Sequence, residues 1–434
     1  MNARSATGAG VAAATGSRSG AVHQFVPALI PRDATGSHTL LLRDALRAAG
    51  WRSEIFAEAT HDELLAESLP LDEYPRRARP GDVLVYQLST SSAVADFLLT
   101  RSEPLVLDYH NITRPELSER WDPEPARRSA EALRQLAALA PRSVLGLADS
   151  HYNEVDLVAA GCPRTAVVPV LVDLDRLLTA PDQRVAARLA AEKADRLAGQ
   201  GAPSGAAGTG VDGASVAAGA DGPGAGAAGA AGADWLFVGR VVPSKAQHDL
   251  VKALWAYRRL YDPTARLHLV GSTPSNRYLA ALRAFIADLG LQGAVRIAGE
   301  VSDAALAAYF DAADVYVSAS LHEGFGVPLL EAMHVGVPVV ARSAGAVDGT
   351  VGDAGLVLDP AGPSVIAAAV RRVLADRSLR DRLVAAGRRQ VTEHTLAGSG
   401  QRTVDAIASV ADAAVVDMAV DVAIGAPGGR VNTP

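Results

Sequence analysis

Short apolar runs that alternate with helical patterns are the feature that most restricts the fold of this 434-residue chain. Continuous runs of three to five residues rich in Val and Leu are typical of strands buried on both faces of a parallel sheet. The stretches between them place apolar residues at helical spacing. The pattern therefore predicts an α/β protein built from doubly wound parallel sheets with helices on both faces.

The alternation occurs in two regions, separated by a segment that consists mostly of Gly and Ala. Because this segment has no aromatic residue, burial cannot offset the entropy of ordering it, and we expect a flexible insert. The predicted divisions are a disordered tail at 1–20, a first domain at 21–200, the insert at 201–233, a second domain at 234–395, a C-terminal helix at 396–424 and a disordered tail at 425–434.

Strands and helices can be placed on this frame. In the first region we expect strands at 22–26, 83–86, 105–109, 144–148 and 166–168, and helices at 39–49 and 126–139. In the second region we expect strands at 235–238, 267–270, 295–298, 315–318 and 337–341, and helices at 245–260, 278–289, 303–312 and 363–375. In doubly wound sheets, ligands bind outside the carboxyl ends of the strands, so two facing domains would form a cleft there.

Composition excludes several classes of function. A net charge of −7 disfavours nonspecific nucleic-acid binding. Cys162 is the only cysteine, which excludes an intrachain disulfide and a cysteine-rich zinc site and fits a reducing compartment. No apolar run is long enough for a membrane span, and no secretory segment is recognisable at the N-terminus. We therefore expect a cytoplasmic protein.

Two cations bracket the loop after the predicted strand at 235–238. Gly239 lets a ligand approach the backbone, and Arg240 and Lys245 stand on either side of Pro243 before a helix begins. Fixed positive charge beside the free N–H groups of a helix N-terminus suits a diphosphate. The alternative interpretation is a pair of solvated surface cations, because basic residues are mostly exposed.

A second motif follows the predicted strand at 315–318. Glu323 and Glu331 are eight positions apart, and the glycines and proline between them predict that Glu323 lies in a loop and Glu331 in the first turns of a helix. Both carboxylates could then face one elongated ligand, and a carboxylate accepts directed hydrogen bonds from sugar hydroxyls. The alternative is that Glu331 is only a favourable acidic residue near a helix N-terminus.

These two segments resemble the retaining glycosyltransferases of family 4, which have the GT-B fold of two Rossmann-like domains facing a cleft. Glu323 to Glu331 matches the family's E-x7-E element, and Arg240 with Lys245 matches its donor-diphosphate pair. The resemblance covers nearly all of residues 234–394. It also implies that the C-terminal helix crosses back onto the first domain.

The resemblance implies a role for each matched residue of the second domain. Arg240 and Lys245 would stabilise the leaving diphosphate, Glu323 would hold the hydroxyls of the transferred sugar, and Glu331 would bind the ribose. No metal and no cofactor are implied. The remaining donor-binding positions are Gly239, Gly271, Val301, Phe325, Gly326 and Val327.

The first region carries weaker matches. Gly36 lies in a stretch that looks like the family's first strand-to-helix loop, near the donor diphosphate. His110 ends a predicted strand and matches the family's active-site histidine, which implies contact with the sugar near its reacting carbon; the alternative is a loop histidine that caps local backbone. Asp149 and Ser150 are interpreted as helix N-caps.

The reaction implied by the resemblance is transfer of a hexose from a nucleotide-diphosphate sugar, with GDP-mannose or a UDP-hexose as donor, as in bacterial surface-polysaccharide assembly. The acceptor would be a hydroxyl of a glycan or of a polyprenyl- or lipid-linked saccharide. The basic loop at residues 74–80 could then make a weak peripheral contact with the inner face of the membrane; a solvated basic loop is the plainer interpretation. Nucleic acid is not an expected partner.

Other functions remain open at this level. A non-catalytic nucleotide-sugar-binding subunit would keep the same donor motifs. A GT-B epimerase or phosphorylase is disfavoured by the two matched motifs, and an NAD-dependent oxidoreductase by the lack of a strand-linked G-x-G-x-x-G with a following acidic residue. Asp173 and Asp175 have the spacing of a metal-binding D-x-D, but no other carboxylate cluster supports them as ligands.

Overall fold

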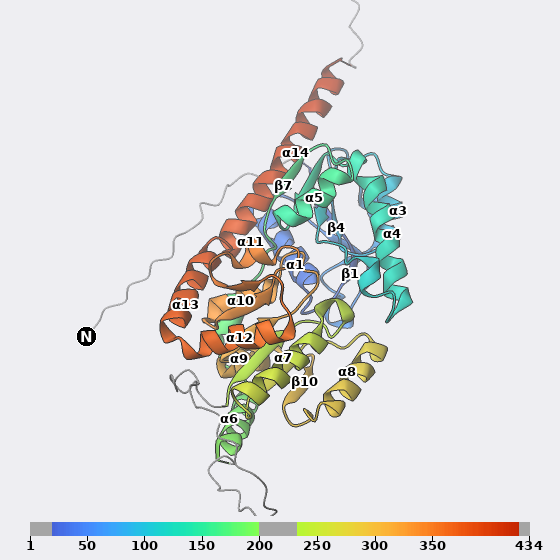
Figure 1. Ribbon diagram of the computed structural model, residues 1–434. Helices are drawn as coiled ribbons and strands as arrows, with labels where there is room; N and C mark the ends of the chain where they lie inside the picture. Colours follow the sequence, from blue (N-terminus) through green and yellow to red (C-terminus); the bar gives the residue numbers. More distant parts are fainter. Residues whose placement is uncertain (1–19, 199–231, 425–434) are drawn as a thin grey trace, which may run out of the picture. The chain divides into compact units, whose positions relative to one another are not determined.

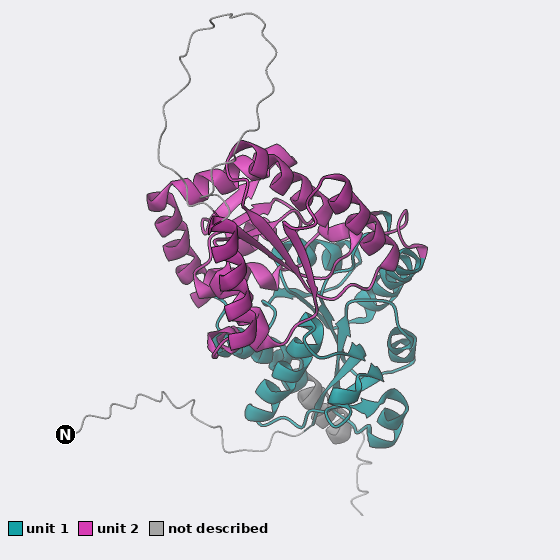
Figure 2. Ribbon diagram, turned by 90° about the horizontal axis from the view of Figure 1, so that it is seen from below, with its two compact units in different colours: residues 1–116, 124–173, 393–434 teal, residues 117–123, 174–392 magenta. Residues whose placement is uncertain are grey.

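The computed structural model describes residues 20–198 and 232–424, and for 414–424 only the backbone. The chain divides into two compact units (Figure 2). The first contains residues 1–116, 124–173 and 393–434, and the second contains residues 117–123 and 174–392. The predicted tails and nearly all of the predicted insert lie outside the described residues.

The first unit is built on a seven-stranded parallel sheet (Figure 1). Its strand order is β3-β2-β1-β4-β5-β6-β7, so the order reverses between β1 and β4. The strands are β1 (Val22–Leu29), β2 (Ile55–Thr60), β3 (Leu69–Pro70), β4 (Val83–Leu88), β5 (Leu105–Tyr109), β6 (Leu145–Ala148) and β7 (Thr165–Val167). Its helices are α1 (Ala34–Ala48), α2 (Tyr74–Arg77), α3 (Ala93–Leu99), α4 (Pro123–Leu139), α5 (His151–Ala159) and α14 (Leu396–Ile424).

The two faces of this sheet have separate cores because successive side chains of a strand point to opposite faces. On β4, Leu84 and Tyr86 belong to one buried cluster, whereas Val83 and Val85 belong to the other. The second cluster also contains residues of α1 and α14, among them Ile407. The C-terminal helix therefore packs on the first sheet's helix α1.

The second unit has a six-stranded parallel sheet in the order β10-β9-β8-β11-β12-β13, which reverses between β8 and β11. Its strands are β8 (Asp234–Val238), β9 (Arg266–Val270), β10 (Val295–Gly299), β11 (Val315–Ser318), β12 (Val339–Arg342) and β13 (Gly355–Leu358). Its helices are α6 (Gln183–Ala198), α7 (Gln247–Leu260), α8 (Asn276–Asp288), α9 (Asp303–Ala312), α10 (Val327–Val335), α11 (Val347–Val351), α12 (Pro363–Ala375) and α13 (Arg377–Thr392).

The structure differs from the predicted elements in a few places. Strands β2, β3 and β13 were not anticipated; β3 has two residues, and β13 has three apolar residues after Gly355. Helix α7 begins at Gln247, because Ala246 before it has a left-handed backbone with φ 47°. Among the described residues, no helix combines the length and the apolarity needed to cross a membrane.

The division between the units falls at Asp173, whereas the sequence predicted a first domain that extends to residue 200. Helix α6 belongs to the second unit because Lys193 and Arg196 pair with Asp234 at the start of β8. The last two residues of the predicted insert are also ordered. The N–H groups of Gly232 and Ala233 both donate to the Asp262 carboxylate at 2.9 Å.

Candidate functional site

The two predicted donor motifs lie at the switch point of the second sheet, where the strand order reverses between β8 and β11. The loop after β8 and the loop after β11 lie at the carboxyl ends of neighbouring strands, where open α/β sheets bind ligands. The N–H of Leu321 donates to the carbonyl of Ser244 at 2.8 Å, which ties one loop to the other. Strand order therefore brings together two segments that are almost eighty residues apart.

Lys245 and Glu323 form an ion pair across these loops. Lys245 Nζ is 2.6 Å from Glu323 Oε1, and both side chains are mostly buried, 17% and 15% exposed. Lys245 also approaches the carbonyl of His322 at 3.5 Å. The ammonium of Lys245 and the carboxylate of Glu323 thus lie side by side at the end of the sheet. The ammonium can bind an anionic group, and the carboxylate can accept a hydrogen bond from a hydroxyl.

Arg240 is the second cation of this edge. Its side chain is exposed and makes no ion pair with any residue that the structure describes. The helix that follows, α7, has no side-chain cap at its N-terminus. The N–H of His248, in the first turn of α7, donates to the Tyr278 hydroxyl at 3.3 Å, so the unpaired guanidinium is the group best suited to bind phosphate oxygens.

Gly271 permits a close approach of two strand ends. Its backbone has φ 141°, and a Cβ placed on it would lie 2.2 Å from the carbonyl oxygen of Gly239. The N–H of Gly271 donates to the carbonyl of Gly299 at the end of β10. Gly239 and Gly271 are therefore adjacent, and Val301 follows β10 in the loop before α9.

The loop from Glu323 to Val327 is supported from behind. The carbonyl of Glu323 accepts from the N–H of Ala346 at 2.9 Å, and the carbonyl of Phe325 accepts from Thr350 Oγ1 at 2.6 Å. Gly326, with φ 91°, is the N-cap of α10 and provides no side-chain cap. The loop is thus fixed through its carbonyls, and Glu331 follows in the second turn of α10, as its spacing predicted.

Glu331 is buried and paired with a residue that the motifs did not include. Its carboxylate bonds to Arg176, which also donates to Asp303 Oδ1 at 2.8 Å. Burial raises the pKa of Glu331, and the Arg176 guanidinium opposes that shift. Arg176 follows Asp175, whose carboxylate lies 3.2 Å from His334 Nε2.

The first unit holds His110 at the carboxyl end of β5. Its Nδ1 is 3.1 Å from Asp149 Oδ2, and its Nε2 bonds to Gln87 Oε1. The side chain is 4% exposed. Burial lowers the pKa of His110, but the carboxylates of Asp149 and Asp108 outweigh that effect and raise the pKa to about 9.

His38, Asp108 and His110 are a group of described residues whose nitrogen and oxygen atoms are close enough for a metal ion, within 4.8 Å of one another. Their hydrogen bonds do not fit that role. His38 Nδ1 accepts from the N–H of Leu171 at 2.9 Å, so Nε2 carries the proton that Asp108 accepts. Both nitrogens of His110 face acceptors. The ring nitrogens of both histidines are thus already engaged in hydrogen bonds.

Gly36 lies in the first turn of α1, but its N–H is already used. Asp33 Oδ2 accepts from the N–H groups of Thr35 and Gly36 at 3.1 and 3.2 Å. A Cβ on Gly36 would lie 2.4 Å from the carbonyl oxygen of Ile30. The structure thus explains this glycine by close packing and places a carboxylate at the helix N-terminus where a diphosphate contact was predicted.

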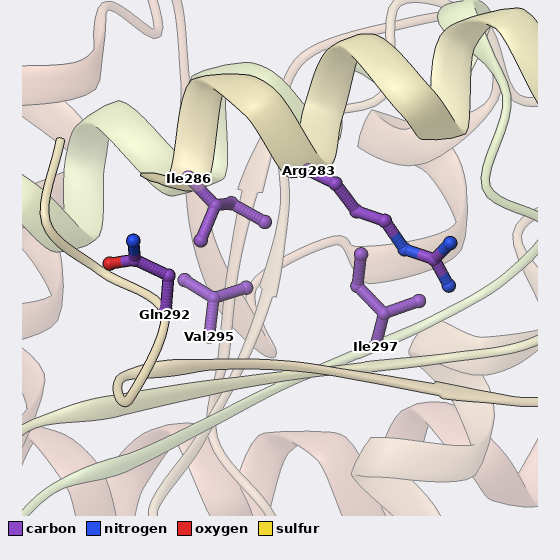
Figure 3. Close-up of a pocket in the computed structure, with 5 residues that line it drawn as sticks. All are labelled: Arg283, Ile286, Gln292, Val295 and Ile297. Atoms are coloured by element: carbon purple, nitrogen blue, oxygen red, sulfur yellow. The ribbon is translucent and has the colours of Figure 1, made fainter. Parts of the chain in front are cut away.

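A cavity of about 280 Å³ lies elsewhere, between α8 and β10 (Figure 3). Its lining residues are Arg283, Ile286, Gln292, Val295 and Ile297. Val295 is the first residue of β10 and Ile297 its third, so the cavity is beside the first half of an edge strand rather than at its carboxyl end. None of the predicted site residues lines it.

Comparison with known families agrees with this geometry. Residues 232–390 match the family model described as "Glycosyl transferases group 1", and the matched segment contains Arg240, Lys245, Glu323 and Glu331. The matched segment lies within the second unit.

Relatives of the group 1 glycosyltransferase domain are known in several bacteria. A D-inositol 3-phosphate glycosyltransferase of Geodermatophilus obscurus is 34% identical over 331 residues, which are 73% of this chain and 63% of the relative. The chain thus spans less than two thirds of that relative. A GDP-mannose-dependent alpha-(1-6)-phosphatidylinositol monomannoside mannosyltransferase of Mycobacterium tuberculosis is 38% identical over 162 residues, 35% of this chain and 41% of the relative.

Solved structures show a likeness of fold over most of the chain. Anabaena HepE in complex with UDP-glucose matches with a TM-score of 0.66 at 18% identity, covering 89% of this chain and 99% of HepE. WaaG, a glycosyltransferase involved in lipopolysaccharide biosynthesis, matches with a TM-score of 0.60 at 13% identity, covering 88% and 98%. The two-sheet architecture of this chain is that of the GT-B fold.

Sequence reasoning missed three residues that complete these sites, Arg176, Gln87 and Asp149. The prediction that Asp149 caps a helix is wrong, because the N-cap of α5 is Ser150, whose hydroxyl accepts from the N–H of Asn153. Asp149 bonds to His110 instead. Its position directly after a buried strand was the available signal, since such positions face ligand sites.

The basic loop at residues 74–80, predicted to touch lipid, makes contacts within the first unit. Tyr74 is fully buried, and Arg76 and Arg77 both pair with Glu73. Arg77 also lies 3.5 Å from Glu54. These acidic partners reduce the charge that the loop could offer to an anionic surface.

Proposed function

We propose that this chain is a hexosyltransferase whose second unit binds a nucleotide-diphosphate sugar. The observation that carries the proposal is the Lys245–Glu323 pair at the sheet's switch point, beside exposed Arg240. A diphosphate needs fixed positive charge, and the adjoining sugar needs a directed hydrogen-bond acceptor. This edge supplies both.

The names of the relatives support glycosyl transfer and suggest the substrates. One is named a D-inositol 3-phosphate glycosyltransferase, and another a GDP-mannose-dependent mannosyltransferase. We propose GDP-mannose or a UDP-hexose as donor and a hydroxyl of a glycan or lipid-linked saccharide as acceptor. The cytoplasmic location and the peripheral membrane contact stay predictions.

The proposed reaction breaks the bond between the sugar's anomeric carbon and the diphosphate oxygen and forms a bond from that carbon to the acceptor oxygen. The acceptor's proton passes to the departing phosphate, on the same face, so configuration is retained. Arg240, Lys245 and the α7 N-terminus stabilise the negative charge that develops on the leaving group, a task that needs no metal in this scheme.

The other residues of the second unit position the donor. Glu323 accepts from the sugar hydroxyls, and its loop offers the N–H groups of Phe325, Gly326 and Val327. Glu331 accepts from the ribose diol while Arg176 holds its carboxylate. Gly239, Gly271 and Val301 let the nucleotide approach the ends of β8, β9 and β10.

A thermal-shift panel with UDP, GDP, ADP, dTDP and NAD, without added metal, tests donor binding. Ligand at a hundredfold excess over Kd stabilises the native state by about 2.7 kcal/mol. We expect a shift with one nucleoside diphosphate, and its loss in Lys245→Met but not in Lys252→Met, an exposed lysine of α7. A shift with NAD alone would instead support an oxidoreductase.

Turnover separates an enzyme from a non-catalytic binding subunit. With the identified nucleotide, the matching sugar donor and a panel of saccharide acceptors, we expect release of the nucleoside diphosphate that depends on the acceptor. Binding without such release under every acceptor would support the subunit.

A further inference from the structure

We propose that Gln24, Gln87 and Asp149 are positioning residues that hold His110 as an imidazolium, a fixed cation that cannot act as a base. The protonation state follows from hydrogen bonds within the first unit alone. Only its use in catalysis rests on the proposed function.

The chain of hydrogen bonds begins at a backbone carbonyl, which can only accept. Gln24 Nε2 donates to the carbonyl of Thr39 in α1 at 2.9 Å. That bond fixes which end of the Gln24 amide is nitrogen, so Gln24 Oε1 points the other way. Gln24 is fully buried in β1, and water cannot replace this partner.

The orientation of the Gln24 amide determines that of Gln87 on β4, the neighbouring strand of the sheet. Gln87 Nε2 lies 2.9 Å from Gln24 Oε1 and 3.2 Å from Asp108 Oδ2. Both neighbours are acceptors, so the Gln87 nitrogen must face them. A flipped amide would place three oxygens together in a buried site, at the cost of lost hydrogen bonds and repulsion. Gln87 Oε1 is therefore directed at His110.

Two acceptors then flank the His110 ring. Nε2 must donate to Gln87 Oε1, and Nδ1 donates to Asp149 Oδ2 at 3.1 Å. Burial raises the pKa of Asp149, but the adjacent His110 favours its ionised form. With Asp149 ionised, a neutral ring could satisfy only one of these bonds. Leaving the other acceptor without a proton would cost more in a buried site than in water. The geometry points to a ring with both protons.

The surrounding charges favour the same state. The carboxylates that face His110 are Asp149 after β6, Asp108 on β5 at 3.9 Å and Asp33 before α1. His38, on α1, stacks edge-on at 4.9 Å, and its Nδ1 accepts a backbone N–H, so it carries a single proton and no charge. His110 is thus the one cation among the groups named here.

Such a ring has no lone pair for a proton and no free N–H to donate. Its remaining chemical property is its positive charge, which stabilises negative charge near it. The proton dissociates only at high pH, consistent with a pKa of about 9 for His110. Rate should then be insensitive to His110 titration through neutral pH.

Ring ¹⁵N NMR of the full-length chain, labelled at histidine, tests the protonation state directly. The His110 signal is identified by its loss in His110→Gln. We expect both nitrogens to report an imidazolium at pH 7 and to titrate near pH 9. A neutral ring at pH 7 in the wild type overturns the proposal.

Variants then test the amide chain. Gln24→Met, which does not touch His110, and Gln87→Met should each raise the proton-dissociation constant of His110 at least tenfold, and Asp149→Asn should raise it further. Gln87→Glu should lower it. Gln135→Met is the matched control, because Gln135 is also buried in this unit and also donates to a backbone carbonyl, that of Ser92. If the Gln24→Met and Gln87→Met proteins are folded and His110 titrates in them as in the wild type, the proposed chain of hydrogen bonds is contradicted.

The NMR result does not depend on donor binding. If the nucleotide thermal shift fails while His110 remains charged, the proposed function fails alone. If transfer occurs, Gln24→Met should lower kcat with KM for the donor unchanged.

Discussion

The protonation of His110 makes the stability of the first unit depend on pH. Its pKa is raised from 6.5 to about 9 in the folded protein, so the folded state binds the proton more tightly than the unfolded chain. This stabilisation is complete below pH 6.5 and is lost as pH rises through about 9. At 1.36 kcal/mol for each pH unit, it amounts to about 3 kcal/mol.

Urea unfolding of the wild type and of His110→Gln, from pH 6 to pH 9.5, measures this contribution. We expect the difference in unfolding free energy between the two proteins to fall by up to about 3 kcal/mol across that range. A difference that does not change with pH would mean that His110 titrates equally in the folded and unfolded chain.

Arg176 compensates a buried charge in the second unit. Glu331 is 3% exposed, and Arg176→Met would leave its carboxylate unpaired. Removing one partner of a buried pair costs about 3–5 kcal/mol. We expect that loss at pH 7 and a smaller one at pH 5, because burial already raises the pKa of Glu331 and protonation removes the charge.

Chemical denaturation at the two pH values checks this, with Arg184→Met as control. Arg184 is an exposed arginine of α6. Equal losses for the two arginine variants would show that the Arg176–Glu331 pair does not stabilise the fold.

At the scale of elements, the approach of β9 to the loop after β8 depends on Gly271. In Gly271→Ala the new Cβ would lie 2.2 Å from the Gly239 carbonyl, on a backbone that L residues rarely adopt. We expect a loss of about 1–3 kcal/mol in stability and at least tenfold weaker nucleoside diphosphate binding. Gly293→Ala is the control, because its Cβ would meet no atom within 4 Å. Calorimetric titration measures both variants.

Helix α14 stabilises the first unit through a few buried side chains. Ile407 is fully buried in a cluster with Leu42 and Leu46 of α1. Ile407→Ala should cost about 2–5 kcal/mol, since the cavity cannot be filled by rigid neighbours. Asp405→Ala, on the exposed side of the same helix, should change stability by less than about 0.5 kcal/mol. Thermal unfolding compares them.

At the scale of the whole molecule, a bound nucleotide should mark one edge of one sheet. Hydrogen exchange with and without the best nucleoside diphosphate should show slower exchange in residues 239–247 and 321–331. The cavity between α8 and β10 should show no change. Protection at that cavity, with none in the two loops, would move the donor site and contradict the assignment.

Much of this molecule is determined by local sequence pattern. Buried runs such as Leu105–Leu107 are apolar because both faces of the strand are covered, and that pattern needs no knowledge of distant residues. Gly326 and Pro328 likewise place Glu323 in a loop and Glu331 in a helix by local backbone preference. The motifs that match the group 1 glycosyltransferase family are of this kind.

Partnerships between distant residues were decided only by tertiary structure. The Lys245–Glu323 pair requires β8 and β11 to be neighbours, and the pairing of Arg176 with Glu331 spans 155 residues. The charge of His110 depends on Gln87 and Asp149, which lie 23 and 39 residues away along the chain. A hydrogen bond depends on which groups lie close together in space. The protonation state of a buried group depends on all the hydrogen bonds and charges around it. The order of residues along the chain therefore does not reveal that state.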